Sequence, residues 1–284
     1  DKNALGFHIP GMFDKVINLN KCHLQKDPSN AIRLSIKRFA DKNKIPYFDI
    51  RKQEGLLRNL TIRNTSTKDL MVLVQFFKKD TSNINLLMEH IKTSFPEITS
   101  LLYIVNKKAN NTIYDQKVIC YHGKDHIIEE MDELYFKIGA KSFFQTNSKQ
   151  AKVLYKKTKE LAQIKKNEIV YDLYTGTGTI AQYVSKSAKK VIGIDSVEEG
   201  IKAAYENAKI NNIKNCTFYT GDMKNIFTDE FIAKNENPDV IITDPPRDGM
   251  HKKVVEQILK IKAKRIVYVS CNSATQARDL SILD

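Results

Sequence analysis

Long apolar runs, cysteine pairs and internal repeats are all absent from this 284-residue sequence. No stretch approaches the roughly 18 apolar residues that a membrane-spanning helix needs, so we expect no membrane segment. No signal peptide opens the sequence, and we expect a cytoplasmic protein. The first residue is Asp1 rather than methionine, and the strand–helix pattern breaks off at Asp284. We therefore expect both chain ends to be truncated.

Cysteine occurs only at Cys22, Cys120, Cys216 and Cys271, and never in a CxxC pair. A disulfide framework is typical of small secreted domains rather than of a chain this long. We therefore expect reduced thiols, with Cys120 and Cys216 in structural roles.

Acidic residues are too few to balance the basic ones. Lysine and arginine total 46 against 33 acids, which gives a formal net charge of +13 at pH 7. Such an excess favours a polyanionic partner such as nucleic acid. Lysine, asparagine and isoleucine are all abundant, so a general compositional bias is the alternative explanation.

The hydrophobic pattern separates residues 1–147 from residues 148–284, and the length is typical of about two domains. The first region mixes helices and strands, which predicts a smaller α/β domain. Its helices are expected at Asn30–Lys42 and Asn83–Ser94, and its strands at Leu56–Arg63, Leu70–Phe77, Leu101–Val105 and Val118–Tyr121.

In residues 148–284 strands alternate with helices, which predicts a Rossmann-like α/β domain with a parallel sheet. Its strands are expected at Glu168–Leu173, Lys190–Ile194, Thr217–Thr220, Val240–Thr243 and Arg265–Val269. Its helices are expected at Lys149–Leu161, Ile180–Ser187, Val197–Asn211 and Lys252–Ile261.

A glycine turn with Gly176 and Gly178 joins the first of these strands to a helix. Glycine lets the backbone approach a ligand closely, but the third glycine of the dinucleotide-binding pattern is missing. Asp195 ends the next strand, where a carboxylate can accept bonds from ribose hydroxyls, and Asp222 ends the following one, within reach of an adenine amino group. Together they favour S-adenosylmethionine; a tight turn with two helix-capping acids is the alternative.

Asp244 begins the sequence Asp-Pro-Pro-Arg at the end of the fourth strand. This resembles a motif of amino-methyltransferases, which stack an aromatic on an extruded base where Arg247 stands here. Arg247 therefore counts against methylation of an exocyclic amine. Asp244 can instead accept a hydrogen bond from N3–H of uracil, a proton that cytosine lacks. A capping aspartate before a proline is the alternative.

Cys271 follows the fifth strand, so it should lie at the same sheet edge as Asp244, where the carboxyl ends of parallel strands face the ligand crevice. A thiolate there can attack a pyrimidine ring, although a lone cysteine is more often a small buried hydrophobe. At the junction of the two regions, Phe143 can stack on a flipped base and Gln145 can read its edge. Core packing and a helix cap are the alternative for that segment.

FFQTN, DLYTGTGTI, DPPRDGM and VSCNSATQARDL, in this order, resemble the RNA uracil-5-methyltransferases, and the branch acting on ribosomal RNA most closely. The resemblance covers most of the chain. It implies methyl transfer from S-adenosylmethionine to C5 of a uridine in RNA, with residues 1–147 helping to recognise that RNA. Ribosomal RNA is the first expectation, and transfer RNA the second.

The resemblance also implies roles for single residues. Cys271 would be the nucleophile that adds to C6 of uracil, Asp244 would lie near cofactor and uracil, and Phe143 would pack on the target base. The positions that line the family's cofactor site correspond to Gln145, Tyr174, Thr179, Asp195 and Asp222. The general base, a glutamate in the family, would lie beyond Asp284.

Cys22 falls where the ribosomal branch places the last ligand of an iron–sulfur cluster. Its three partner cysteines are not in this sequence, and one thiolate cannot hold a four-thiolate cluster. A cluster in the intact protein and an ordinary buried thiol both stay open. Two other functions also stay open, namely an amino-methyltransferase acting on a nucleic-acid base and a non-catalytic RNA-binding module. We expect a monomer.

Overall fold

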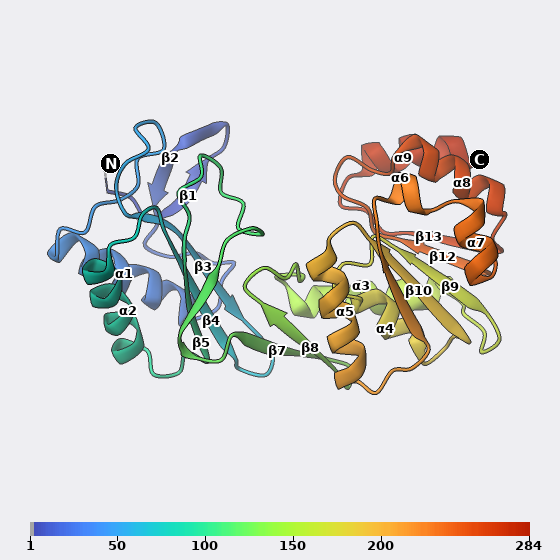
Figure 1. Cartoon of the computed structure of the whole chain (residues 1–284), viewed down its shortest axis with the longest axis horizontal. Coiled ribbons are helices and arrows are strands. Elements are labelled where there is room, and N and C mark those ends of the chain that lie inside the picture. The colour runs from blue at the N-terminus through green and yellow to red at the C-terminus, as the bar shows by residue number, and fades with distance from the viewer. Residues whose placement is uncertain (1–2) are drawn as a thin grey trace. The chain divides into compact units, whose positions relative to one another are not determined.

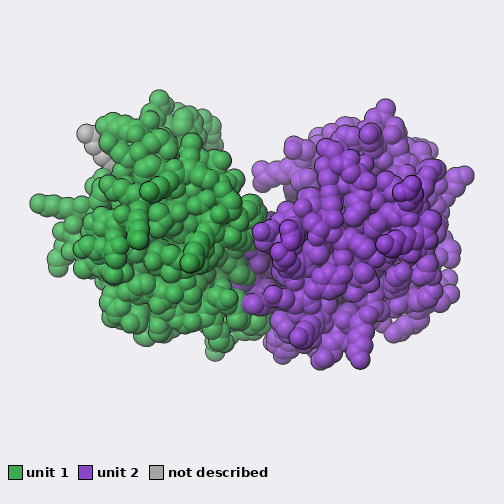
Figure 2. Space-filling model, in the orientation of Figure 1, with its two compact units in different colours: residues 1–129, 139–141 green, residues 130–138, 142–284 purple. Residues whose placement is uncertain are grey.

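The computed structural model describes residues 3–284 and divides into two compact units (Figures 1 and 2). One unit comprises residues 3–129 and 139–141, and the other comprises residues 130–138 and 142–284. The second unit therefore begins before the boundary expected at residue 147. The physical reason is that Met131, Leu134 and Phe136 are buried in its hydrophobic core.

The first unit is built on a four-stranded sheet in the order β3-β4-β5-β6. β4 pairs antiparallel with β3 and parallel with β5, and every residue of β4 is buried. Side chains of α1 and α2 pack in one core with this sheet. The bounds are α1 Ser29–Lys42, β3 Leu57–Asn64, β4 Leu70–Phe76, α2 Thr81–Ser94, β5 Ser100–Val105 and β6 Val118–Gly123.

Two hairpins were not expected from the sequence. β1 (Gly6–Ile9) pairs with β2 (Met12–Asn18), and both strands are largely exposed. β7 (His126–Met131) pairs with β8 (Leu134–Gly139), and this second hairpin spans the division between the units.

The second unit has a five-stranded parallel sheet in the order β11-β10-β9-β12-β13. Successive strands are added outward from β9 in one direction, and the chain then returns to add β12 and β13 on the other side. Ligands of such sheets bind at this reversal, outside the carboxyl ends of the strands. The bounds are β9 Ile169–Leu173, β10 Lys190–Asp195, β11 Cys216–Thr220, β12 Val240–Thr243 and β13 Arg265–Tyr268.

Helices cover both faces of this sheet (Figure 1). Adjacent strand residues point to opposite faces, so Val170 packs in one core and Tyr171 in the other. The first core takes side chains from α3 (Ser148–Ala162), α4 (Thr179–Ser185) and α5 (Glu198–Ile210). The second lies under α6 (Met223–Ile226), α7 (Asp229–Asn235), α8 (Lys252–Ile261) and α9 (Ser273–Leu283). The expected Rossmann-like architecture is confirmed.

Within residues 3–284, no helix combines the length and the apolar character that crossing a membrane requires.

Candidate active site

The turn after β9 uses its two glycines for different purposes. Tyr174, Gly176 and Gly178 all have left-handed backbone, with φ of 64°, 56° and 74°. A Cβ on Gly178 would lie 2.8 Å from Cβ of Ala204 and 2.9 Å from a ring carbon of Phe218, so this glycine permits helix–sheet packing. A Cβ on Gly176 would meet nothing within 4 Å. Gly176 thus leaves open space where a ligand can approach the backbone.

Asp172 lies fully buried beneath this turn, and the sequence analysis missed it. Its Oδ2 accepts bonds from the Thr175 hydroxyl at 2.5 Å and from the Ala181 main-chain nitrogen at 2.9 Å, while Oδ1 has no hydrogen-bond partner. Burial raises the pKa of Asp172 to about 7, against the opposing effect of those two hydrogen bonds. The sequence did contain a signal for Asp172, because an acidic residue is unusual inside a strand that is otherwise apolar.

Asp195 ties the glycine turn to the end of β10. Its Oδ2 accepts a bond from the Gly176 nitrogen at 2.9 Å, and its Oδ1 accepts one from the Val197 nitrogen at 2.8 Å. Asp222, at the end of β11, caps α6 by accepting from the Lys224 nitrogen at 3.2 Å. The side-chain hydrogen bond from Lys224 holds the pKa of Asp222 below its usual range. Asp222 therefore makes the capping bond of the alternative interpretation, whereas Asp195 accepts from the N-cap residue of α5 without capping that helix.

Three further predicted positions lie in the same unit. Tyr174 is half-buried, and burial, followed by the charges of Asp279, Asp222 and Asp195, raises its pKa to about 12. Thr179 is buried at the start of α4, with its hydroxyl 3.2 Å from that of Thr177. Gln145 is half-buried in the segment before α3.

The adjacent aromatics Phe143 and Phe144 behave differently. Phe144 packs against the core, with its ring centroid 5.8 Å from that of Phe136. Phe143 is 68% exposed, so its ring is available for stacking.

Asp244 lies at the end of β12, next to the end of β9. Its main-chain nitrogen donates to the carbonyl oxygen of Leu173 at 3.3 Å. The side chain is half-buried, and burial raises the pKa of Asp244 to about 6. Near pH 7 this carboxyl is therefore mostly ionised and able to accept a hydrogen bond.

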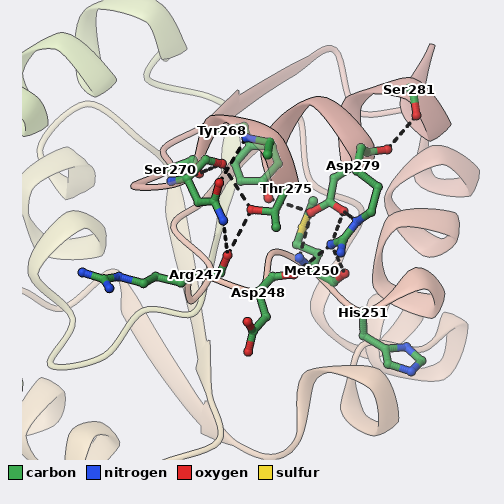
Figure 3. A network of polar contacts seen from close by, with 12 residues as sticks. Arg247, Asp248, Met250, His251, Tyr268, Ser270, Thr275, Asp279 and Ser281 are labelled. Atoms are coloured by element: carbon green, nitrogen blue, oxygen red, sulfur yellow. Dashed lines mark hydrogen bonds and ion pairs between the residues drawn. The ribbon is translucent and has the colours of Figure 1, made fainter. Parts of the chain in front are cut away.

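The loop that carries Cys271 is joined to the loop that follows Asp244 (Figure 3). The Asn272 side-chain nitrogen donates to the carbonyl oxygen of Arg247 at 3.0 Å, and the Thr275 hydroxyl donates to the same oxygen at 3.1 Å. Asn272 also caps α9 by accepting from the Ala274 nitrogen. Cys271 is exposed between β13 and α9. The structure thus brings together the two loops that the sequence predicted to share a sheet edge.

Cys22 lies outside this site, in the first unit, and is half-buried. Its main chain is held by Asn30, which accepts from the Cys22 nitrogen at 2.7 Å and donates to its oxygen at 3.1 Å. No group of three side chains able to hold a metal occurs in the described part of the chain. The residues present therefore do not fit an iron–sulfur cluster. All four cysteines are free thiols, with Cys216 buried and Cys120 exposed.

Residues 164–281 match the protein family described as a methyltransferase domain. This part of the chain is therefore similar to methyltransferase domains. It has the Rossmann-like fold of S-adenosylmethionine-dependent enzymes, as the sequence predicted.

Relatives of known sequence match nearly the whole chain. A protein of Porphyromonas gingivalis named "uncharacterized RNA methyltransferase" is 55% identical over 99% of this chain and 61% of its own length. One of the same name from Bacteroides thetaiotaomicron is 56% identical over 99% of this chain and 63% of its own length. The chain thus spans about three fifths of these relatives.

Among solved structures, the Pyrococcus abyssi tRNA (uracil-54, C5)-methyltransferase in complex with S-adenosyl-L-homocysteine matches with a TM-score of 0.78. It is 31% identical, and the match covers 96% of this chain and 64% of that one. The expected similarity to RNA methyltransferases is confirmed. The finer assignments to uracil C5 and to ribosomal RNA stay predictions.

Proposed function

We propose that this chain forms the catalytic part of an enzyme that methylates C5 of a uridine in RNA through Cys271. The observation that carries the proposal is the junction at the Arg247 carbonyl oxygen, which joins the Cys271 loop to the Asp244 loop. That junction lies at the ends of β12 and β13, in the same sheet as the glycine turn after β9. An exposed thiol and an acceptor carboxylate beside a cofactor turn suit attack on a uracil ring.

The cofactor side of the site fits S-adenosylmethionine, which supplies the transferred methyl group when bound. The open space at Gly176 admits a ligand to the backbone, and Oδ1 of Asp172 leaves an acceptor without a protein partner beneath the turn. We assign the ribose hydroxyls to Asp195 and the adenine to Asp222. Further contacts are assigned to Gln145, Tyr174, Gly178 and Thr179.

On the base side, Asp244 would accept the N3–H of uracil, and this bond would orient the ring and exclude cytosine. The Cys271 thiolate would then add to C6 and give an enolate, whose C5 would take the methyl group of S-adenosylmethionine and leave S-adenosylhomocysteine. Removal of the C5 proton by a base, followed by elimination of the thiolate, would restore the C5–C6 double bond and free the enzyme. The glutamate that the resemblance predicts beyond Asp284 would be that base.

For the RNA, the net charge of +13 supports phosphate contacts that give affinity without sequence information. The target uridine would be flipped from its stack, with the exposed Phe143 ring against it. We propose ribosomal RNA as the substrate and transfer RNA as the second choice, which the name of the P. abyssi enzyme supports. Monomeric action in the cytoplasm and a contribution of the first unit to RNA recognition belong to the same proposal.

A trapping assay tests this function. RNA that contains 5-fluorouridine blocks the proton-removal step, so the adduct between protein and RNA accumulates in the presence of S-adenosylmethionine. We expect a denaturant-resistant adduct on Cys271 by mass spectrometry, abolished by Cys271→Ala but not by Cys120→Ala, which removes another exposed thiol.

The pattern of adducts decides between the alternatives. An adduct with transfer RNA but not ribosomal RNA would keep the chemistry and change the substrate. Base methylation that survives Cys271→Ala would establish an amino-methyltransferase. RNA binding without S-adenosylhomocysteine binding, measured by calorimetry, would establish a non-catalytic module.

A further inference from the structure

Asp279, on α9, is a charged residue that the proposed chemistry leaves unused. Its side chain is only 1% exposed. Oδ2 accepts from the Met250 main-chain nitrogen at 2.8 Å and from the Tyr268 hydroxyl at 2.7 Å. Oδ1 accepts from the Arg278 guanidinium at 2.9 and 2.7 Å. Burial raises the pKa of Asp279, but the bonds from Tyr268, Met250 and Arg278 lower it more, so it stays below its usual value.

The Arg278 guanidinium extends this network to the loop that follows Asp244. It donates to the carbonyl oxygens of Asp248 at 2.9 Å and Met250 at 3.3 Å (Figure 3). Gly249 between them has φ of 76°, and a Cβ there would lie 2.5 Å from Nη2 of Arg278 and 2.7 Å from Oδ2 of Asp279. The loop therefore approaches α9 as closely as a residue without a side chain allows.

The Met250 side chain is buried in the hydrophobic core and also anchors the loop, whereas the outer side of the loop is open. A hollow of about 560 Å³ opens there, lined by residues 248–252 together with Arg278, Asp279 and Ile282. Hydrogen bonds to α9 thus restrain the loop together with the buried Met250 side chain. The N-terminal end of α9 holds Arg247 through Asn272 and Thr275, and Asn272 directly follows Cys271 in the sequence.

We propose that the Arg278–Asp279 pair is a positioning device that sets the distance between Asp244 and Cys271 by fixing both of their loops to α9. The proposal rests on the proposed uracil chemistry. Neither residue touches the substrate in this account. The pair fixes the loop after Asp244 at Asp248 and Met250. Asn272, the N-cap of α9, fixes the same loop at Arg247 and directly follows Cys271. Losing the pair would leave cofactor and RNA binding intact and would misplace the reacting groups.

Single-turnover adduct formation at saturating RNA tests the proposal. Arg278→Ala is the first variant because half of this side chain is exposed, so its removal should not prevent folding. We expect the rate to fall at least about tenfold, since a misplacement of about 1 Å can cost about a hundredfold. The Kd for S-adenosylhomocysteine and the KM for RNA should not change.

Asp279→Asn and Gly249→Ala should show the same pattern, and the Arg278→Ala/Asp279→Asn double variant should be no slower than the slower single variant, because the two residues act as one unit. Asp229→Asn, which removes another ion-paired aspartate on α7, serves as the matched control and should react like the wild type.

Three results would overturn the proposal. Wild-type rates in Arg278→Ala would show that the pair does not position the loops. If the slower variants also bound S-adenosylhomocysteine more weakly and had a lower Tm, the pair would have a merely structural role. A wild-type protein that forms no adduct would overturn the uracil chemistry, and this proposal with it, whereas the first two results leave that chemistry standing.

Discussion

The main-chain nitrogen of Gly176 donates a hydrogen bond to the carboxylate of Asp195, 2.9 Å away. The same residue that would receive the ribose therefore also holds the turn against which the cofactor would lie. The Asp195 carboxylate would thus both hold the glycine turn in shape and bind the ribose hydroxyls.

Replacing Asp195 by alanine should accordingly weaken S-adenosylhomocysteine binding. Hydrogen bonds to charged groups contribute about 1.5–3 kcal/mol, which corresponds to roughly ten- to hundredfold in Kd. Isothermal titration calorimetry measures the loss. Asp195→Asn keeps an acceptor for the Gly176 nitrogen and should lose less, so equal losses in the two variants would argue against the tether.

The two glycines of the turn should separate stability from binding. Gly178→Ala adds a clash with Ala204 and Phe218 and should lower the free energy of unfolding by about 1–3 kcal/mol, with a further ~1–2 kcal/mol from its left-handed backbone. Gly176→Ala should lose only the stability that the left-handed backbone costs, because its methyl group meets no other atom. That methyl group enters the open space, however, and should reduce cofactor affinity. Thermal unfolding and calorimetry of both variants test this, and a larger Tm loss in Gly176→Ala would contradict it.

Asp244 should leave a mark on the pH dependence of the reaction. Because burial raises its pKa to about 6, the carboxylate that accepts N3–H is lost as pH falls through that value. The logarithm of the adduct-formation rate should therefore fall more steeply below about pH 6 than above it. Asp244→Asn has no carboxylate to protonate, so its slower reaction should lack this steepening. If the pH profile of Asp244→Asn were the same as that of the wild type, Asp244 would have no part in the chemistry.

Asp172 should instead affect stability. Its pKa is raised from 3.8 to about 7 in the folded protein, so the folded state binds this proton more tightly than the unfolded one. Its contribution to stability is full below about pH 4 and is lost as pH rises through about 7. Without cofactor, the unfolding free energy of the wild type relative to Asp172→Asn should fall over that window. A difference that is constant with pH would mean that the pKa of Asp172 is the same in the folded and the unfolded protein.

Phe143 and Phe144 form a matched pair for the RNA side. Phe143→Ala should leave Tm unchanged because the ring is exposed. It should slow adduct formation, since base–aromatic stacking contributes about 1–3 kcal/mol. Phe144→Ala should do the reverse and lower Tm, because its ring packs against the core. Equal effects of the two changes on the reaction would argue against stacking by Phe143.

The sequence predicted the second unit well because its strands are short apolar runs between turn residues. Val240–Thr243, for example, is buried throughout and could be placed without tertiary information. The β1–β2 hairpin could not, because neither strand has a fully buried residue and their sequences show no clear alternation of apolar and polar residues. The unit boundary was missed because the burial of Phe136 depends on helices that follow it in the chain.

The site shows the same limit. Asp244, Cys271 and the turn glycines stand beside recognisable strand ends, so local pattern was enough to predict their place at this edge of the sheet. Asp279 was missed because its partners Tyr268 and Met250 are 11 and 29 residues away and meet it only in the folded protein. A charged residue inside a helix gives no local sign that it is buried and fully paired.

The ties that α9 makes have a consequence for the order in which the site is completed on the ribosome. The glycine turn, Asp195 and Asp222 all precede β12, and their mutual bonds involve nothing synthesised later. The loops with Asp244 and Cys271 acquire their shared anchor only when α9, which follows both, has emerged and folded. In a nascent chain the loops of the thiol and the carboxylate would thus be set against each other last, so the proposed chemistry would wait for the emergence of α9.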